Sequence, residues 1–264
     1  MSNPLRLARR AGASVLQWAC SLGLGYALWR FVLAPHLSPV FFTGPNQVFS
    51  QLRSFAETGA LWSMVRVTLS EALLGFALGA TIGVLLAVAI GVLPSLFAKV
   101  VEPVVSGVYA MPKFVLAPIL FVWVGTGLLP RAYLVLAAVL PVVTIYTVGG
   151  IRTVDTDQVK MLLLLGANRR QVARTLIVPH MFRYLMTSIA VVIPHALTVA
   201  VGAEILFGAD NGIGGTLYTA GEFFRPAAVL GALLVGTIIS AVLMAASRAV
   251  ESHFLGRMAG SARG

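Results

Sequence analysis

Long apolar runs recur along the whole chain and limit it to one class of fold. A helix needs about 20 apolar residues to cross a bilayer, where it satisfies its own backbone hydrogen bonds. Six runs approach or exceed this length, at residues 15–33, 67–92, 103–124, 132–149, 185–207 and 227–249. The sequence therefore predicts an all-α integral membrane protein with six transmembrane helices.

The composition supports this class and excludes others. The chain is 58% hydrophobic and only 11% charged, whereas soluble domains carry about 25% charged residues. Cys20 is the only cysteine, so no disulfide framework or cysteine metal site can form within the chain. The four histidines show no metal-ligand spacing. The net charge of +10 is interpreted as a topology signal, and no nucleic-acid partner is expected.

The cations are distributed unevenly between the loops. With the N-terminus in the cytoplasm, most of the 19 lysines and arginines fall on the cytoplasmic side, in agreement with the positive-inside rule. This orientation places both termini and the basic loop at residues 151–183 in the cytoplasm. Arg6, Arg170 and Arg257 are then cytoplasmic, whereas Arg53 and Asp210 are external.

The longest polar interruption, residues 151–183, has the pattern of a helix, a turn and a second helix. Residues 157–165 form an apolar, strongly helix-forming stretch, and Gly166 supplies the flexible backbone that a helix end needs. Asn168 is a suitable N-cap for the helix that follows. Pro179 is expected to break that second helix before the chain re-enters the membrane.

The second half of this loop has one apolar and one cationic face. Val172, Leu176 and Pro179 can turn inward, while Arg170 and Arg174, four residues apart, point outward. The residues alone leave two interpretations open. One is an ordinary basic loop lying on anionic lipid, and the other is a surface that binds a cytoplasmic partner.

Three glycines recur at every fourth position of the second apolar run, namely Gly75, Gly79 and Gly83. Small residues at this spacing let helices approach each other closely in lipid. We expect a packing seam within one subunit, and a seam between two copies is the alternative.

No sequence that binds the phosphates of ATP is present. The motif Gly-x-x-x-x-Gly-Lys-Ser/Thr is absent, and none of the three lysines follows a glycine. Motifs of membrane proteases and lipases are absent as well. We therefore expect no catalytic residue, no metal and no cofactor on this chain.

The basic loop resembles the EAA loop of the permease subunits of binding-protein-dependent ABC importers. That loop reads Glu-Ala-Ala, three residues, Gly, nine residues, Ile, one residue and Leu-Pro. With the family glycine on Gly166, the family proline falls on Pro179, and Leu176 and Val178 are apolar matches. The Glu-Ala-Ala positions fall on residues 160–162, which read Lys-Met-Leu and match none of the three.

Further segments are similar to the nitrate/sulfonate/taurine branch of that family. Residues 110–127 are similar to its Pro-Lys-x-Ala-Leu-x-Pro segment and the stretch after it, and residues 203–214 resemble its Ala-Glu-Leu-Phe-Gly signature. Residues 74–76, Leu-Gly-Phe, are similar too, although Glu71 stands where those permeases usually carry an arginine. The resemblance covers about residues 40–250.

The resemblance implies a type I ABC importer permease fold, with residues 1–264 as one transmembrane permease domain and its core at about residues 60–250. It implies a second permease copy, forming a homodimer, two cytoplasmic ATPase subunits that bind ATP and Mg²⁺, and an external substrate-binding protein. The protein would lie in the lipid bilayer of a bacterial cytoplasmic (inner) membrane. The expected substrate is a small anion, such as a sulfonate or nitrate, or a small heterocycle.

A stand-alone secondary transporter or channel is the alternative function. It is disfavoured because the sequence shows no convincing inverted repeat and no chain of carboxylates inside the apolar runs.

The resemblance also implies two sets of functional residues. The residues expected to couple to the ATPase are Leu165, Gly166, Ala167, Asn168, Arg169, Arg170 and Pro179. The residues expected in the translocation pathway are Glu71, Lys113, Pro118 and Glu204. For Glu204 the alternative is a helix-end carboxylate that faces water or bonds to Tyr218 or Thr219. The Lys113 side chain could instead extend to the membrane interface.

Four prolines lie inside the apolar runs, namely Pro112, Pro118, Pro141 and Pro194. Each is expected to bend or break its helix. Broken helices often line the substrate route of a transporter.

Overall fold

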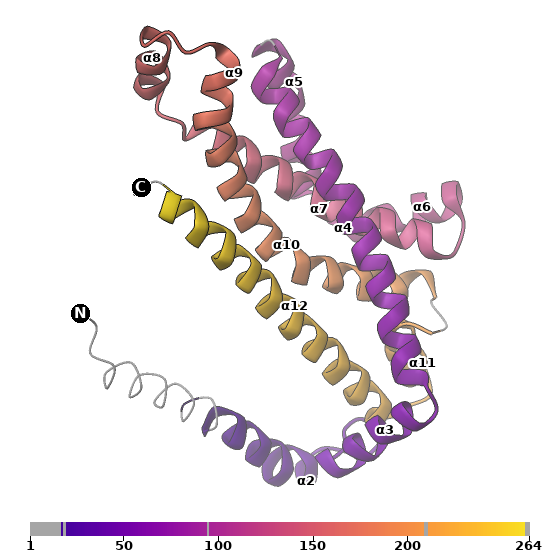
Figure 1. Cartoon of the computed structure of the whole chain (residues 1–264). Helices are drawn as coiled ribbons and strands as arrows, with labels where there is room; N and C mark the ends of the chain where they lie inside the picture. Colours follow the sequence, from indigo (N-terminus) through magenta and orange to yellow (C-terminus); the bar gives the residue numbers. More distant parts are fainter. Residues whose placement is uncertain (1–16, 18–19, 94, 209–210, 262–264) are drawn as a thin grey trace, which may run out of the picture. The chain divides into compact units, whose positions relative to one another are not determined.

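Helices form all the regular secondary structure in the described part of the chain, which confirms the all-α prediction (Figure 1). The computed structural model describes residues 17, 20–93, 95–208 and 211–261. In chain order the elements are η1 (Leu28–Leu33), α2 (Ala34–His36), α3 (Pro45–Glu57), α4 (Ala60–Val92), α5 (Ser95–Ala110), η2 (Lys113–Leu116), α6 (Ala117–Val124), α7 (Leu128–Arg152), α8 (Thr156–Leu164), α9 (Arg169–Val172), η3 (Ala173–Ile177), α10 (Val178–Phe207), α11 (Ile213–Glu222) and α12 (Pro226–Ser261).

Four helical segments are long and apolar enough to cross a membrane: Ala60–Gly91, Leu128–Arg152, Arg169–Phe207 and Pro226–Phe254. The bent pair Ser95–Ala110 and Lys113–Val124 makes a fifth if it counts as one span. The first predicted span begins outside the described residues, and its described part is helical over residues 20–36. Arg6 and Asp210 also lie outside the described residues. The number of six spans therefore stays a prediction.

The chain divides into two compact units, and the first consists of Met1–Trp62 and Thr216–Leu234. Helix α3 begins with Pro45, whose missing N–H needs no partner in a first turn. It is followed by Gly59, which adopts a φ of 76°. Phe55 of α3 is buried, and a Cβ added at Gly231 of α12 would lie 3.4 Å from its ring. Within this unit α3 therefore packs against the start of α12.

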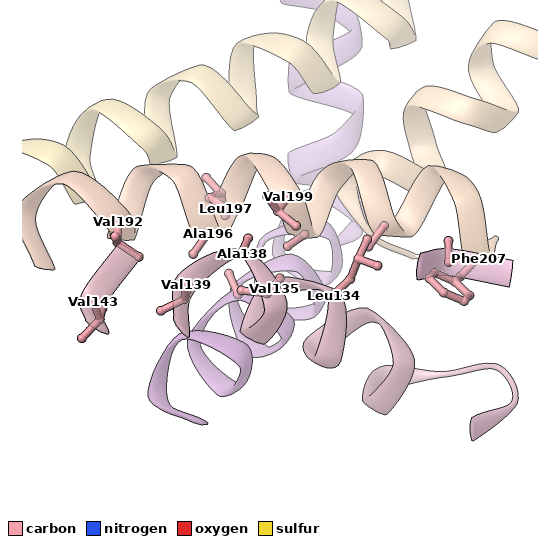
Figure 2. Packing of buried hydrophobic residues seen from close by; sticks show 14 residues of the cluster. Leu134, Val135, Ala138, Val139, Val143, Val192, Ala196, Leu197, Val199 and Phe207 are labelled. Carbon is pink, nitrogen blue, oxygen red and sulfur yellow. The ribbon is translucent and has the colours of Figure 1, made fainter. Parts of the chain in front are cut away.

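The second unit consists of Ser63–Gly215 and Val235–Gly264, and its core lies between α7 and α10. Figure 2 shows the buried side chains of both helices meeting along their length. The α7 side contributes mainly leucine and valine, and the α10 side adds alanines such as Ala196, Ala200 and Ala203. Because lipid is as apolar as these side chains, close van der Waals packing stabilises the helix pair more than hydrophobic transfer does.

The predicted glycine seam packs inside the chain, against α7. A Cβ added at Gly75 would lie 2.5 Å from Val135 Cβ, and one at Gly79 would lie 2.9 Å from Val139 Cβ. At Gly83 the nearest atom would be the Leu140 carbonyl oxygen at 2.9 Å. Only glycine permits this separation of α4 and α7, and the prediction of a seam within one subunit is confirmed.

The third predicted span, residues 103–124, differs from the structure in two ways. Its helix begins earlier, because α5 starts at Ser95 and accommodates Pro103 in its interior. It also breaks after Ala110, and the two parts of the bent pair meet at 97°. Pro112 explains the break, since it disfavours helical backbone at the preceding residue and itself adopts an extended ψ of 111°.

The other prolines do not interrupt their helices. Pro141 and Pro194 lie inside α7 and α10, which continue past them. Pro118 lies in the first turn of α6, where a missing N–H costs nothing. A break therefore occurs at Pro112 alone among these four, and a bend at the other three prolines stays a prediction.

Candidate functional site

The basic loop contains the predicted first helix and turn. Helix α8 is capped at its N-terminus by Asp155, whose carboxylate accepts a hydrogen bond from the Asp157 N–H at 2.8 Å. After α8 the chain turns at Gly166, which has a φ of +87°. Glycine adopts this left-handed conformation without steric strain, so the predicted role of Gly166 at the helix end is confirmed.

A capping box starts the second helix of the loop. The Asn168 side chain accepts a hydrogen bond from the Gln171 N–H at 2.9 Å, and the Gln171 side chain accepts one from the Asn168 N–H at 2.7 Å. Both bonds satisfy backbone groups that a helix start otherwise leaves unpaired. The predicted N-cap at Asn168 is confirmed, and the direction in which Arg169 and Arg170 leave the turn is fixed.

The faces of the second helix are as the sequence predicts. Val172 is buried, and Leu176 and Pro179 are partly buried. Arg170 and Arg174 are exposed. The helix therefore anchors its apolar side on the rest of the unit and presents its cations outward.

The end of α8 exposes apolar surface, of which the sequence had singled out Leu165 alone. Leu164 is 88% exposed and Leu165 is 76% exposed, and Met161 of the same helix is exposed too. Leucines exposed to this degree on a polar loop are typical of a surface that another protein covers.

Pro179 does not break the second helix, and this prediction is wrong. Helix α9, the π-helical turn η3 and α10 follow one another without a gap, so residues 169–207 form one helical segment (Figure 1). The wider π turn, Ala173–Ile177, comes directly before Pro179. A π turn shifts the hydrogen-bond pattern by one residue, which accommodates a proline that has no N–H to donate.

Arg152, the first cation of the loop, is held by the membrane part of the unit. Its guanidinium forms an ion pair with Glu102 of α5. The pair borders a cavity of about 340 Å³ whose walls come from α4, α5 and α7. The start of the loop is therefore attached to α5 as well as to α7.

Glu204 lies in a buried polar cluster near the end of α10. The Thr68 hydroxyl of α4 donates to Glu204 Oε1 at 2.6 Å, and the Gly214 N–H of α11 donates to Oε2 at 2.5 Å. Thr68 in turn accepts a hydrogen bond from the Ile213 N–H at 3.0 Å. Glu204 and Thr68 are fully buried. The carboxylate therefore joins α10, α4 and the first turn of α11.

Glu71 belongs to the same cluster and has an arginine partner. Arg131 Nη1 of α7 lies 3.0 Å from Glu71 Oε1, and Glu71 also interacts with Glu204. Glu71 is fully buried and the Arg131 side chain is 11% exposed. One guanidinium thus faces two buried carboxylates, and the cluster connects all four helices. Two predicted pathway residues, Glu71 and Glu204, are brought together here.

The sequence did not identify the partners in this cluster. Arg131 lies only three residues after Leu128, the first residue of α7. A carboxylate inside an apolar run requires a cationic partner. This rule could have identified Arg131 as a candidate partner of Glu71. Of the two alternative partners of Glu204, Tyr218 interacts with Glu222 instead, whose hydrogen bond and negative charge raise the pKa of the phenol.

The other two predicted pathway residues lie at the bend after α5. The Lys113 ammonium donates to the Tyr109 carbonyl oxygen and lies 5.3 Å from the centroid of the Tyr109 ring. Pro118 is exposed in the first turn of α6. Both residues keep exposed surface, unlike Glu71 and Glu204. Within the described residues, no group of three or more acidic, histidine or cysteine side chains could hold a metal ion.

Comparisons with known proteins place these features in one family. The profile of the family described as "binding-protein-dependent transport system inner membrane component" matches residues 79–260. The taurine transport system permease protein TauC of Escherichia coli is 24% identical over 228 residues, which cover 84% of this chain and 82% of TauC. The putative aliphatic sulfonates transport permease protein SsuC of Bacillus subtilis is 23% identical, over 80% of this chain and 76% of SsuC.

A further relative and two solved structures agree with that match. The formylaminopyrimidine transport permease protein ThiX of Halalkalibacterium halodurans is 29% identical, over 57% of this chain and 65% of ThiX. A chain of a bacterial ABC transporter that imports alginate has a TM-score of 0.64 at 15% identity and covers 94% of this chain and 99% of its own length. An inward-facing MetNI methionine ABC transporter has a TM-score of 0.59 at 19% identity, over 73% of this chain and 93% of that one. These structures share the fold.

Proposed function

The chain belongs to the family of binding-protein-dependent transport system inner membrane components, and we propose that it forms the translocation pathway of an ATP-driven importer. In this proposal it spans the inner membrane six times with both termini in the cytoplasm, and it pairs with a second copy of itself. Two ATPase subunits bind ATP and Mg²⁺ on the cytoplasmic side. An external binding protein delivers the substrate.

The observation that carries the proposal is the continuity of the basic loop with a membrane span. The turn that exposes Leu165, Arg169 and Arg170 leads directly into the helical segment Arg169–Phe207. At 1.5 Å per residue, these 39 residues extend about 58 Å. A displacement of the loop by an ATPase would therefore be transmitted along α10 into the membrane.

The buried cluster would carry that displacement to the neighbouring helices. Glu204 near the far end of α10 binds Thr68 of α4 and the Gly214 N–H of α11, and Arg131 of α7 faces Glu71 beside it. We assign Glu71 and Glu204 to this connection between helices, and Lys113 and Pro118 to the pathway itself. Leu165 to Arg170, with Pro179 behind them, are assigned to the ATPase contact.

The substrate class follows from the relatives and from charge. Two relatives are named for taurine and aliphatic sulfonates, and another is named for formylaminopyrimidine. The intramembrane cation Lys113 favours an acidic solute. A small organic anion, such as a sulfonate, is therefore the substrate that we propose.

Reconstitution in proteoliposomes tests this function. The chain would be purified with the ATPase that co-purifies with it, and uptake of ³⁵S-taurine would be measured with the external binding protein and ATP. The matched control is the same complex whose ATPase carries a substitution of its phosphate-loop lysine. Uptake that requires ATP and both partners supports the proposal. Uptake by the chain alone, driven by an ion gradient, would establish a secondary transporter instead.

A further inference from the structure

The positive charge of Lys113 is held in place at the bend between α5 and α6 without being neutralised. Its ammonium is oriented by the Tyr109 carbonyl oxygen and by the Tyr109 ring, and neither group carries a formal negative charge. An ammonium has three N–H donors, so the carbonyl leaves donors available. Among the described residues, Lys113 takes part in no ion pair.

The described carboxylates of the same unit are engaged elsewhere. The partners are Arg131 for Glu71, Arg152 for Glu102, the Asp157 N–H for Asp155, Lys160 for Asp157, Thr68 and Gly214 for Glu204, and Thr187 for Glu251. An intramembrane cation normally pairs with a carboxylate or a backbone carbonyl, or faces an aqueous cavity. Lys113 has one carbonyl partner and no carboxylate among the described residues, so its remaining donors are available to an anion from outside the chain.

The segment that carries Lys113 packs directly on α10. The Phe114 ring covers Gly202, where an added Cβ would lie only 2.5 Å from Phe114 Cζ. Towards the start of α10, Thr198 and His195 follow on the same face as Gly202, at spacings of four and three residues. Both side chains are exposed, whereas the face that packs on α7 carries buried residues such as Ala196 and Ala200.

His195 lies two helical turns from Gly202, on the face of α10 that the Phe114 ring covers. The Thr198 hydroxyl donates its proton to the Pro194 carbonyl oxygen at 3.2 Å, so it offers no donor to a ligand. The available donors on this face are therefore the Lys113 ammonium and the His195 ring N–H. Polar side chains exposed within a membrane span face a water-filled route or another protein surface far more often than lipid.

We propose that Lys113 and His195 form the subsite that binds the acidic group of the transported solute, a sulfonate or a similar strong-acid anion. The proposal rests on the importer function proposed above and adds the residues that select the charge of the substrate. The ammonium and the imidazole N–H donate to oxygens of the anion, while the Tyr109 ring keeps the ammonium at the bend. A solute with no acidic group gains nothing from this pair.

Cysteine labelling tests the subsite without requiring transport. Because Cys20 is the only cysteine, the variant Cys20→Ser, Thr198→Cys carries one thiol, on the face beside His195. Membrane vesicles containing the complete complex would be treated with two methanethiosulfonate reagents of similar size, the anionic sulfonatoethyl and the cationic trimethylammonioethyl compound. The measured quantity is the ratio of their reaction rates, with a thiol at the native position 20 as the reference.

We expect the anionic reagent to be favoured at position 198, and the added variant Lys113→Met to lower the rate ratio about tenfold or more, as a lost charged hydrogen bond predicts. Lys113→Arg should keep the ratio. Lys99→Met, which removes an exposed lysine of α5, should leave it unchanged. His195→Leu provides a second variant that should lower the ratio if Lys113→Met does not assemble with the ATPase.

A thiol at position 198 that reacts with neither reagent, or a ratio that Lys113→Met and His195→Leu leave unchanged, would overturn the subsite. Failure of the importer function is recognised separately, by the absence of ATP-dependent uptake in the wild-type complex.

Discussion

Arg131 Nη1 lies 3.0 Å from Glu71 Oε1, and this ion pair joins α7 to α4 in the interior of the unit. Among the described residues, the same guanidinium is the one cation that interacts with a cluster that also contains Glu204. The resemblance in sequence implies an arginine at the position of Glu71 in related permeases. We infer that Arg131 supplies from α7 the charge that such an arginine would carry on α4.

Loss of Arg131 should destabilise the protein more than loss of Glu71. The substitution Arg131→Gln leaves two buried carboxylates without a cation, and breaking a buried pair in this way costs about 3–5 kcal/mol. Glu71→Gln still leaves Arg131 opposite Glu204, so its cost should be smaller. Thermal unfolding of the detergent-solubilised complex, followed by tryptophan fluorescence, measures both.

Two further variants control the comparison. Arg53→Gln breaks an ion pair with Glu57 in which both side chains are mostly exposed, and such pairs contribute only about 0.2–1 kcal/mol. The double variant Glu71→Arg, Arg131→Gln restores one guanidinium beside Glu204 and should unfold closer to the wild type than Arg131→Gln does. If the double variant is the least stable of the set, the inference that an arginine on α4 can replace Arg131 of α7 is incorrect.

Glu204→Gln should loosen the start of α11. The carboxylate accepts hydrogen bonds from both the Thr68 hydroxyl and the Gly214 N–H, and a carboxamide can replace only part of this acceptor capacity. We expect the Gly214 amide to exchange its hydrogen at least about tenfold faster, because a charged hydrogen bond is worth about 1.5–3 kcal/mol. Hydrogen exchange followed by mass spectrometry would show this.

Glu251→Gln is the matched control, because that carboxylate binds Thr187 in a partly exposed position. Unchanged exchange at Gly214 in Glu204→Gln would mean that the carboxylate does not hold the first turn of α11.

Gly75→Ala should separate α4 from α7. The added methyl group would lie 2.5 Å from both the Ala132 carbonyl oxygen and Val135 Cβ, and overpacking of this kind costs about 1–3 kcal/mol. Gly107→Ala in α5 adds the same methyl group where no atom lies within 4 Å. Gly107→Ala should therefore be neutral or slightly stabilising in the same unfolding measurement. Equal stability of the two variants would contradict the seam.

Local sequence patterns predicted the helices well. They could not predict contacts between residues that lie far apart in the sequence. Gly166 and Asn168 act within one turn of the backbone, so residue type and position sufficed to predict the helix end and the N-cap. Pro112 and Pro179 are both prolines in apolar surroundings, yet only the first coincides with a break. The π turn before Pro179 depends on the packing of residues 173–177, which no residue pattern reveals.

The buried cluster shows the same limit. Glu71 and Glu204 stood out because carboxylates are rare in apolar runs. Thr68 and Arg131 did not, because a threonine in a span and an arginine near a span end are common. Their roles follow only from the register in which α4, α7 and α10 pack.

Gly166→Pro should uncouple ATP hydrolysis from transport while leaving the spans inserted. Proline fixes φ near about −65°, whereas Gly166 has a φ of +87° and its N–H donates to the Leu163 carbonyl oxygen at 3.0 Å. The turn that orients Arg169 and Arg170 would be lost. ATP hydrolysis and uptake by proteoliposomes, measured at equal permease content, should give a much lower uptake per ATP hydrolysed.

Gly149→Ala is the control variant. It adds a methyl group where no atom lies within 4 Å, leaves the loop intact and should retain coupling. Full uptake per ATP in Gly166→Pro would show that the turn does not transmit the motion of the ATPase.

Arg170→Glu should weaken binding of the ATPase more than Lys160→Glu does. Arg170 is exposed on the face opposite the buried Val172, and the capping box of Asn168 and Gln171 fixes its direction. Lys160 lies on α8 and already forms an exposed pair with Asp157 at 2.9 Å. Residues 160–162 also depart from the Glu-Ala-Ala of the family, so the contact should depend mainly on the half of the loop after Gly166.

A reversed charge at an interface typically costs several kcal/mol, which would reduce co-purification of the ATPase at least about tenfold. Co-purification would be measured against equal membrane levels of permease, with Arg174→Glu testing the next exposed cation on the same face. If Lys160→Glu is the more damaging change, the contact lies on α8 and its exposed Leu164, and the assignment of Arg169 and Arg170 must be given up.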